Sequence, residues 1–323
     1  MSLKPIVMTP AYRYGAMTPW GGDSLRTIYG QDIPDEHTGE ALEFSALPGL
    51  NSTDAEDRTL TELIAEHGAA LLGTEIHEPV PLLLKLIDAR QSLSVQVHPN
   101  DAYAAKAEHK LGKTEAWFIL HAEPGAKLVY GIRPGYDLAS LRALCERGAA
   151  VEEALNYLPV KAGDAVYIPA GTVHAIGAGI VLYEIQQSSN VTYRFYDWDR
   201  KDKDGKGREL HLDKALNVTR LDVEPKLVEA ELVGLNAQGT FERVLNTEYF
   251  VVDRLTKCAD MQLITDLRRF GILTALEDGM MELPGEDIPL KAGQTAAIPA
   301  DCVPVRLRGE RFLYAYPQLG LGK

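Results

Sequence analysis

The stretch KAGDAVYIPAGTV at Lys161–Val173 recurs, with changes, as KAGQTAAIPADCV at Lys291–Val303. The copies start 130 residues apart (291 − 161 = 130) and share KAG, IPA and the final Val at the same internal spacing. Such a repeat indicates that one folding unit has been duplicated. The first copy reads as a strand, a tight turn at Pro and Gly, and a returning strand.

The two copies differ at the residue that follows the shared Val. It is His174 in the first copy and Pro304 in the second. From Gly163 to His174 the first copy fits the pattern G-x5-P-x-G-x2-H, which aims the His into a barrel. We expect a metal ligand there, the alternative being a satisfied barrel histidine, and we expect the second copy to be metal-free.

Short β-rich runs bounded by Gly, Pro and Asp clusters occupy most of the chain and predict a sandwich or jelly roll. The predicted strands are Ser92–His98, Ala116–His121, Ala165–Pro169, Gly179–Glu184, Thr192–Tyr196, Phe250–Leu255 and Arg311–Tyr316. Helical patterns are few and short: Leu60–Leu72, Asp101–Leu111 closing at Gly112, Leu138–Arg147 and Glu152–Tyr157.

The pattern ending at His174 resembles the second half of the cupin signature. Together with the repeat, it predicts a mainly β chain of two cupin-like units, each a double-stranded β-helix or jelly roll, with a few short helices. We place a metal-binding, catalytic unit with small helical insertions at residues 1–235, and a second, metal-free unit at residues 236–323.

Strand alternation proposes the remaining metal ligands. Over Gln91–His98 it puts Leu93, Val95 and Val97 on one face, and Ser94, Gln96 and His98 on the other. Glu115 shares a face with Lys113 and Trp117 on a later strand. The candidate ligands Gln96, His98, Glu115 and His174 would offer O, N, O and N to one divalent ion, a set that suits Zn²⁺.

Composition limits the partners of the chain. Its 323 residues carry 46 acidic and 33 basic side chains, a formal net charge of −13. Such a chain repels phosphate backbones and anionic lipid, so we expect neither nucleic-acid nor membrane binding. A small anionic substrate would need a local cluster of Lys and Arg. The N-terminus lacks a signal-peptide pattern and three scattered cysteines suggest no disulfide framework, so we expect a cytoplasmic protein.

Four strings resemble the type I mannose-6-phosphate isomerases (phosphomannose isomerases) of the cupin superfamily, in their short bacterial form. They are PLLLKLIDARQSLSVQVHPND (81–101), GKTEAWFIL (112–120), IPAGTVHAIG (168–177) and EIQQSSNVTYRFYDWDR (184–200). The resemblance runs from WGG at Trp20–Gly22 to about His211, and more loosely to the end. It implies an aldose-ketose isomerase that interconverts mannose 6-phosphate and fructose 6-phosphate by proton transfer through a cis-enediol.

The resemblance also implies roles for particular residues. In the family a QxH motif, a later Glu and the His of the PAGTxHA turn bind one zinc ion, and they fall on the four candidate ligands above. The essential arginine lies ten residues beyond a glutamate, which gives Arg194 and Glu184 here (194 − 184 = 10). We rank Glu184 above Lys113 as the proton-shuttling base, because lysine has an ordinary pKa of about 10.4.

Substrate contacts are expected from Ser94, Lys85, Lys113 and Trp20. Lys85 interrupts an apolar run, where a lysine needs an anionic partner, so a structural ion pair is the alternative role. Leu42 stands where the family commonly has Trp. Alternatives for the whole chain are another cupin sugar-phosphate isomerase or epimerase, or a non-catalytic, metal-dependent sugar-phosphate-binding protein. We expect a monomer or a weak homodimer.

Overall fold

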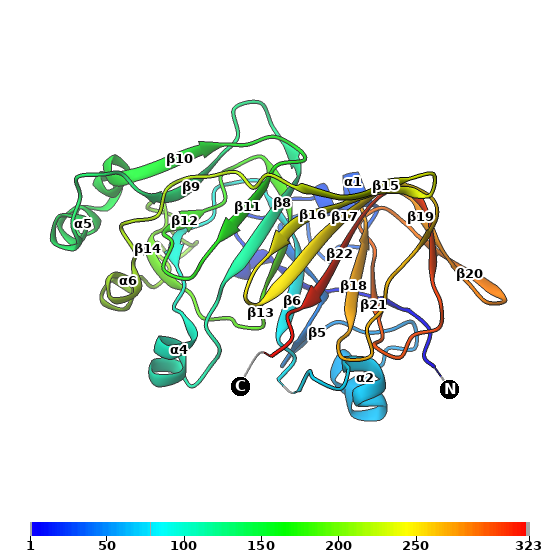
Figure 1. The fold of residues 1–323 in the computed structure, drawn as a ribbon. Coiled ribbons are helices and arrows are strands. Elements are labelled where there is room, and N and C mark those ends of the chain that lie inside the picture. Colours follow the sequence, from blue (N-terminus) through cyan, green and yellow to red (C-terminus); the bar gives the residue numbers. More distant parts are fainter. Residues whose placement is uncertain (1, 78, 321–323) are drawn as a thin grey trace.

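Three antiparallel β-sheets form successive layers of the molecule (Figure 1). The computed structural model describes residues 2–77 and 79–320. A six-stranded sheet lies in the middle, a five-stranded sheet covers one of its faces, and a nine-stranded sheet covers the other. The fold is mainly β and contains two cupin-like units, as predicted.

The six-stranded sheet is buried on both faces. Its order is β11 (Ala165–Ile168), β8 (Glu115–Ala122), β13 (Ile180–Gln187), β6 (Leu82–Ala89), β3 (Thr38–Phe44) and β2 (Ala11–Tyr14). Every residue of β6 and of β13 is buried. A strand covered on both sides needs a continuous apolar run rather than an alternating one, which explains the sequence LLLKLIDA.

Short helices cover the outer side of the five-stranded sheet. Its order is β10 (Leu155–Pro159), β9 (Lys127–Ile132), β12 (His174–Ala175), β7 (Val95–Val97) and β14 (Tyr193–Tyr196). Val95, Val97, Tyr193 and Phe195 pack outward against α5 (Leu138–Cys145) and α6 (Leu212–Val218). The intervening residues of β7 and β14 therefore face the six-stranded sheet.

The nine-stranded sheet is built mainly from the last third of the chain. Its path is β1 (Ile6–Met8), β21 (Thr295–Ile298), β18 (Gly271–Ala275), β22 (Arg306–Pro317), β17 (Phe250–Gln262), β16 (Gly239–Asn246) and β15 (Glu231–Asn236), with β19 (Gly279–Leu283) and β20 (Glu286–Leu290) attached to β22. Two of these strands, β1 and β15, begin outside residues 236–323. The division at residue 235 stays a prediction.

Strand register relates the two units residue by residue. In the first unit Ile168 of β11 lies opposite Glu115 of β8. In the second unit Ile298 of β21, which is 130 residues later, lies opposite Gly271 of β18. Ile168 and Ile298 are separated by the same 130 residues as the repeated sequences. Their strands pair in the same way in both units, which agrees with the predicted duplication.

The helices are shorter than the sequence patterns suggested. The pattern at Leu60–Leu72 is divided into α2 (Leu60–His67) and α3 (Ala69–Leu72) by Gly68. Helix α4 (Asp101–Glu108) ends at His109, which takes the left-handed conformation that we had assigned to Gly112. The remaining helices are η1 (Gly15–Met17), α1 (Ser24–Tyr29) and η2 (Gly148–Ala154), and β4 (Ala46–Leu47) pairs with β5 (Leu50–Asn51). Within the described ranges, none of the helices combines the length and apolar character needed to cross a bilayer.

The predicted helix at Glu152–Tyr157 was wrong. Its first residues belong to η2, and β10 begins at Leu155. The strand pairs with β9, with Tyr157 opposite Val129 and Pro159 opposite Lys127. Sheet pairing outweighs the helical spacing of so short a segment, because helices of this length gain most of their stability from packing.

Candidate active site and metal centre

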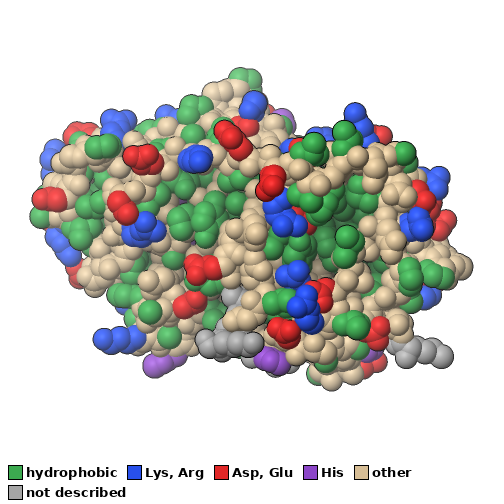
Figure 2. Space-filling view, viewed as in Figure 1, with side chains coloured by type: hydrophobic (Ala, Val, Ile, Leu, Met, Phe, Trp, Pro, Cys, Tyr) green, Lys and Arg blue, Asp and Glu red, His purple; other side chains and the backbone are tan. Residues whose placement is uncertain are grey.

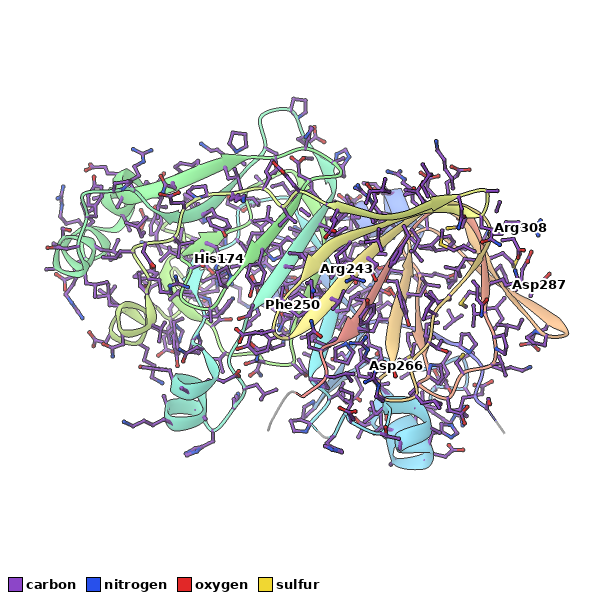
Figure 3. The ribbon with its side chains drawn as sticks, in the orientation of Figure 1. His174, Arg243, Phe250, Asp266, Asp287 and Arg308 are labelled. Carbon is purple, nitrogen blue, oxygen red and sulfur yellow. The ribbon has the colours of Figure 1, made fainter. Side chains whose placement is uncertain are left out.

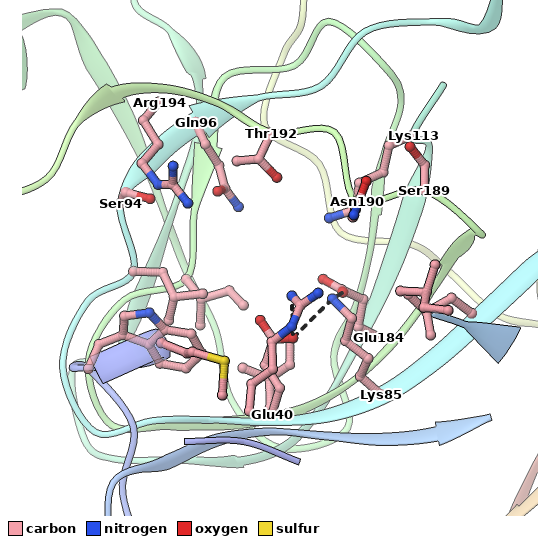
Figure 4. Close-up of a pocket in the computed structure, with 18 of the residues that line it drawn as sticks. Glu40, Lys85, Ser94, Gln96, Lys113, Glu184, Ser189, Asn190, Thr192 and Arg194 are labelled. Carbon is pink, nitrogen blue, oxygen red and sulfur yellow. Dashed lines mark hydrogen bonds and ion pairs between the residues drawn. The ribbon is translucent and has the colours of Figure 1, made fainter. Parts of the chain in front are cut away.

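A cleft opens between the five-stranded and six-stranded sheets (Figure 4). Seven residues singled out from the sequence line it: Trp20, Lys85, Ser94, Gln96, Lys113, Glu184 and Arg194. The same cleft is lined by residues that sequence reasoning did not select, among them Arg13, Glu40, Asn190, Thr192 and Arg208. Concentrated polar groups in a cleft of a mainly apolar barrel mark a candidate active site.

Three of the four candidate metal ligands converge next to the cleft, in contact with its lining residues Gln96 and Lys113. His98 follows β7, Glu115 begins β8 and His174 begins β12, and one ligand atom from each lies within 4.8 Å of the others. All three side chains are buried. They come from both facing sheets, so the barrel itself sets their spacing.

Both imidazoles are oriented by backbone carbonyl groups. His98 Nδ1 lies 2.9 Å from Val191 O, and His174 Nδ1 lies 2.8 Å from Thr172 O. A proton on each Nδ1 leaves the lone pair on Nε2, which lies 3.1 Å from Lys113 Nζ in His98 and 3.2 Å from Glu115 Oε1 in His174. Burial lowers the pKa of His174 to about 4, and burial with the charge of Lys113 lowers the pKa of His98 well below its usual value. Neutral imidazoles of this kind are suited to bind a metal.

The Glu115 carboxylate is completely buried and lacks a well-aligned hydrogen bond to either oxygen within the described residues. Its nearest partners are Lys113 Nζ at 2.8 Å and His174 Nε2 at 3.2 Å. Burial raises the pKa of Glu115 to about 7, with Lys113 acting in the opposite direction. A buried carboxylate with unused acceptor capacity, between two neutral imidazoles, fits a divalent cation.

Gln96 completes the predicted ligand group. It lies opposite His174 on one side and Arg194 on the other, and its amide nitrogen is 3.4 Å from His174 Nε2. A rotation of the Gln96 amide by half a turn would place its oxygen, in place of its nitrogen, next to His174 Nε2. The predicted face of Val95 and Val97 is correct, but Leu93 precedes β7 and lies with Ser94 at the cleft.

A buried chain of ion pairs crosses the six-stranded side of the cleft. Lys85 Nζ lies 3.0 Å from Glu184 Oε1 and 3.4 Å from Glu40 Oε2. Trp117 Nε1 donates to Glu184 Oε2 at 2.9 Å. Lys85 therefore forms the structural ion pair that the sequence offered as its alternative role, and it also lines the cleft.

The charge of Glu184 is stabilised within this chain of ion pairs. Burial alone would raise the pKa of Glu184, but Lys85 and Lys113 outweigh it and lower the pKa to about 2. The opposite holds for Lys85, since Glu184 and Glu40 overcome the effect of burial and raise its pKa. Glu184 is thus a carboxylate and Lys85 an ammonium group at neutral pH.

Two arginines, Arg194 and Arg208, line the cleft away from the pair formed by Lys85 and Glu184. Arg194 lies on β14 beside Gln96 and Ser94, across from Glu184 (Figure 4). Arg208 reaches the cleft from the loop after β14. No periodic pattern in that polar loop indicated Arg208, and Glu40 and Arg13 come from strands far from the recognised motifs.

A hydrogen-bonded group from both units supports the segment that carries Lys113 and Glu115. Asp101 accepts from Gly112 N at 2.8 Å, from Gln187 Nε2 at 3.0 Å and from Tyr249 Oη at 3.0 Å. A Cβ on Gly112 would lie 2.5 Å from the backbone of Asn100, so this glycine is required by close packing. Tyr249 belongs to the turn between β16 and β17, in the second unit.

The chain is similar to several known proteins. A family model described as phosphomannose isomerase type I, catalytic domain, matches residues 12–127. The chain is 42% identical over 240 residues to a mannose-6-phosphate isomerase of Streptococcus mutans, which covers 72% of this chain and 73% of that protein. It is 36% identical over 320 residues to mannose-6-phosphate isomerase ManA of Bacillus subtilis, covering 96% and 97%.

Solved structures share the fold. The mannose 6-phosphate isomerase of Bacillus subtilis superimposes with a TM-score of 0.89 at 32% identity, over 97% of this chain and 99% of that one. A mutant phosphomannose isomerase from Salmonella typhimurium has a TM-score of 0.75 at 18% identity, over 98% and 100%. The second likeness supports the fold alone.

Proposed function

The chain belongs to the type I phosphomannose isomerase family, and from this premise we propose that it interconverts mannose 6-phosphate and fructose 6-phosphate through a cis-enediol. One observation carries the proposal. The cleft brings an ionised carboxylate, Glu184, and a guanidinium, Arg194, to the same space as the buried group formed by His98, Glu115 and His174. A non-catalytic sugar-binding site would not need all of these groups.

We propose that Gln96, His98, Glu115 and His174 hold one Zn²⁺ ion per chain. The neutral imidazoles and the buried Glu115 oxygens fit this ion, and Lys113 already provides positive charge between two of these residues, 3.1 Å from His98 and 2.8 Å from Glu115. When bound, the metal would polarise substrate oxygens as a Lewis acid and so acidify the neighbouring C–H group.

Glu184 is the proposed base. It removes the proton from C2 of the aldose and returns it to C1 to give the ketose, so the carboxylate is regenerated in each cycle. Lys85 keeps it ionised, at 3.0 Å, and Trp117 fixes the second oxygen, at 2.9 Å. Lys113 is the alternative base, and its pairing with Glu115 in the structure makes it less available for that role.

Arg194 would stabilise the negative charge that develops on the enediolate oxygen. Its place on β14, directly opposite Gln96, supports this role, since charge stabilisation requires a donor fixed close to the reacting oxygens. Trp20 packs in the cleft wall against Gly39, where a Cβ would come within 2.6 Å of the indole. It would shape the sugar site by excluding water.

The test is conversion of mannose 6-phosphate to fructose 6-phosphate by purified protein, before chelation, after chelation and after zinc is added back. We expect turnover that chelation abolishes and zinc restores. Absence of turnover with metal demonstrably bound would overturn the proposed reaction. Full turnover after complete metal removal would instead overturn the proposed ligands. A cytoplasmic location and a monomeric or weakly dimeric state stay predictions from the sequence.

A further inference from the structure

Positive charge is neutralised in the part of the cleft next to the carboxylates of Glu40, Glu115 and Glu184. The three cations there are each close to a carboxylate, at 2.8 to 3.1 Å: Lys85 with Glu184, Lys113 with Glu115, and Arg13 with Glu40. Without a metal this part of the cleft is close to neutral. A phosphate dianion brought here would compete with carboxylates that are already paired.

The arginines lie in a different electrostatic setting. Arg208 donates from Nε and Nη2 to both oxygens of Asp197, at 2.8 and 2.6 Å, and Arg200 donates to the same carboxylate at 3.0 Å. Asp197 is only 5% exposed. In the part of the chain that the structure describes, Arg194 forms no ion pair, and its Nε is buried without an acceptor. Two guanidinium groups, those of Arg208 and Arg200, thus share one carboxylate.

Local charge here is opposite in sign to that of the whole chain. The three arginines and Asp197 sum to +2, whereas the chain carries a formal −13. A phosphate group carries close to two negative charges at neutral pH. Guanidinium groups also match phosphate in shape, because they donate two parallel hydrogen bonds from one plane.

We propose that Arg208 binds the phosphate group of the sugar substrate, and that Asp197 holds the Arg208 guanidinium in place. The inference rests on the proposed isomerase function. Asp197 engages Nε and Nη2 of Arg208, which leaves Nη1 to donate to the phosphate. Ser94 lies beside Arg194 and supplies a neutral donor at the same end (Figure 4).

This assignment orients the substrate and revises one expectation from the sequence. With its phosphate at Arg208, the sugar extends past Arg194 toward Gln96 and Glu184. Lys85 and Lys113, which we had considered as phosphate or sugar contacts, then serve the reacting end of the substrate.

The test compares Arg208→Ala with Arg268→Ala. Arg268 forms the same kind of two-point pair, with Asp266 at 3.0 and 2.9 Å, but lies in the second unit away from this cleft. For Arg208→Ala we expect the KM for mannose 6-phosphate to rise at least about tenfold with kcat within about threefold, the signature of lost ground-state binding. The inhibition constant of inorganic phosphate should rise in parallel. Arg208→Lys should recover part of both, and Arg268→Ala should match the wild type.

The outcomes separate this inference from the proposed function. If the wild type fails to convert mannose 6-phosphate, the proposed function falls. If the wild type is active and Arg208→Ala keeps its KM and its sensitivity to phosphate, the phosphate site is elsewhere. Melting temperatures of both variants check folding, and Asp197→Asn provides a second variant that should weaken phosphate inhibition while leaving Arg208 present.

Discussion

The first unit is a barrel formed by the five-stranded and six-stranded sheets, and the second unit is a barrel formed by the nine-stranded sheet. The two barrels share one arrangement of strands and differ in the side chains that point into it. Strand register puts Gly271 where the first barrel has Glu115, Asp253 where it has Lys85, and Tyr314 where it has Glu184. The sequence repeat puts Pro304 in the place of His174. Replacing these inward-facing side chains removes the counterparts of Glu115, Glu184 and His174, while the sheet pairing is kept.

In the second barrel, Tyr314 occupies the space that a side chain at Gly271 would need, beside an open cleft lined by Arg243, Asp253 and Tyr316. A Cβ on Gly271 would lie 2.3 Å from the hydroxyl oxygen of Tyr314, so the tyrosine ring takes up the volume of the glutamate. The second barrel keeps a polar pair formed by Arg243, which is labelled in Figure 3, and Asp253. Tyr316 Oη also contacts Asp253, at 2.9 Å. This carboxylate is paired, in contrast to Glu115. On the face seen in Figure 2, hydrophobic and charged side chains are interspersed over both units.

The largest difference between the two barrels, in metal content and in kcat, is expected at the equivalent turn positions His174 and Pro304. His174→Ala should remove bound metal and lower kcat below about one thousandth of the wild-type value, because the substrate oxygen loses its Lewis acid. Pro304→His in the second barrel should leave the metal content at one ion per chain. Metal analysis and turnover measured on the same samples check both. Two ions in Pro304→His would mean that the second barrel still holds a metal site.

Lys85→Met tests the charge pair that Asp253 and Tyr314 replace in the second barrel. Without Lys85, burial raises the pKa of Glu184, so we expect a loss of kcat of about a hundredfold and an acidic limb of the pH–rate profile at higher pH. The pair also contributes to stability. Because the pKa of Glu184 falls from 4.5 to about 2 on folding, that contribution is complete above pH 4.5 and is lost as the pH falls toward 2.

Unfolding measured as a function of pH provides the check for this pair. The wild type should lose stability between about pH 4.5 and pH 2 as Glu184 takes up its proton. In Lys85→Met the folded-state pKa of Glu184 moves back toward or above its unfolded value, so this acid-induced loss should shrink or reverse. Lys4→Met is a matched control, since Lys4 pairs with Glu286 at 2.6 Å on the exposed surface. Identical pH–rate profiles for Lys85→Met and the wild type would contradict the role given to Lys85.

The candidate ligands could be proposed from the sequence because alternation on one strand fixes which side chains share a face. Gln96 and His98 follow from that rule alone, and His174 from a local turn pattern. Glu40 and Arg208 could not be found in this way, since they reach the cleft through pairings between distant segments. The segment at Glu152–Tyr157 was misread because pairing with β9 outweighs its helical spacing.

Gly271→Glu asks whether the second barrel can be returned to the state of the first. The new side chain meets Tyr314, and the nearby Arg243 is already paired with Asp253, so we expect a loss of about 2 kcal/mol or more in unfolding free energy and no added metal. Denaturant unfolding measures this. Gly285→Glu, where a Cβ meets nothing within 4 Å, controls for the added charge, although its φ of 90° adds backbone strain. Wild-type stability in Gly271→Glu would show that the space is not filled.

The smallest effect on stability and kcat is expected at the hydrogen bond from Tyr249 of the second barrel to Asp101 of the first. Tyr249→Phe removes one hydrogen bond to Asp101, so we expect about 1 kcal/mol of lost stability and a fall in kcat of a few-fold, with KM nearly unchanged. Tyr103→Phe is the control, since Tyr103 is only partly buried on α4 and its hydroxyl makes no hydrogen bond within the described residues. An equal effect on kcat in both variants would argue against a role in positioning Lys113.

The doubly buried middle sheet constrains how this chain can change over evolutionary time. Strands of the second barrel present alternate residues to it: Val252, Ile272 and Leu313 pack against Leu84, Leu86 and Tyr183 of the first barrel. The residues between them point into the second barrel's own interior. The second barrel can therefore lose its chemistry without being discarded, because selection still acts on its outer residues as the cover of a catalytic sheet. A shortened gene encoding the first barrel alone would expose that surface and yield an aggregating product.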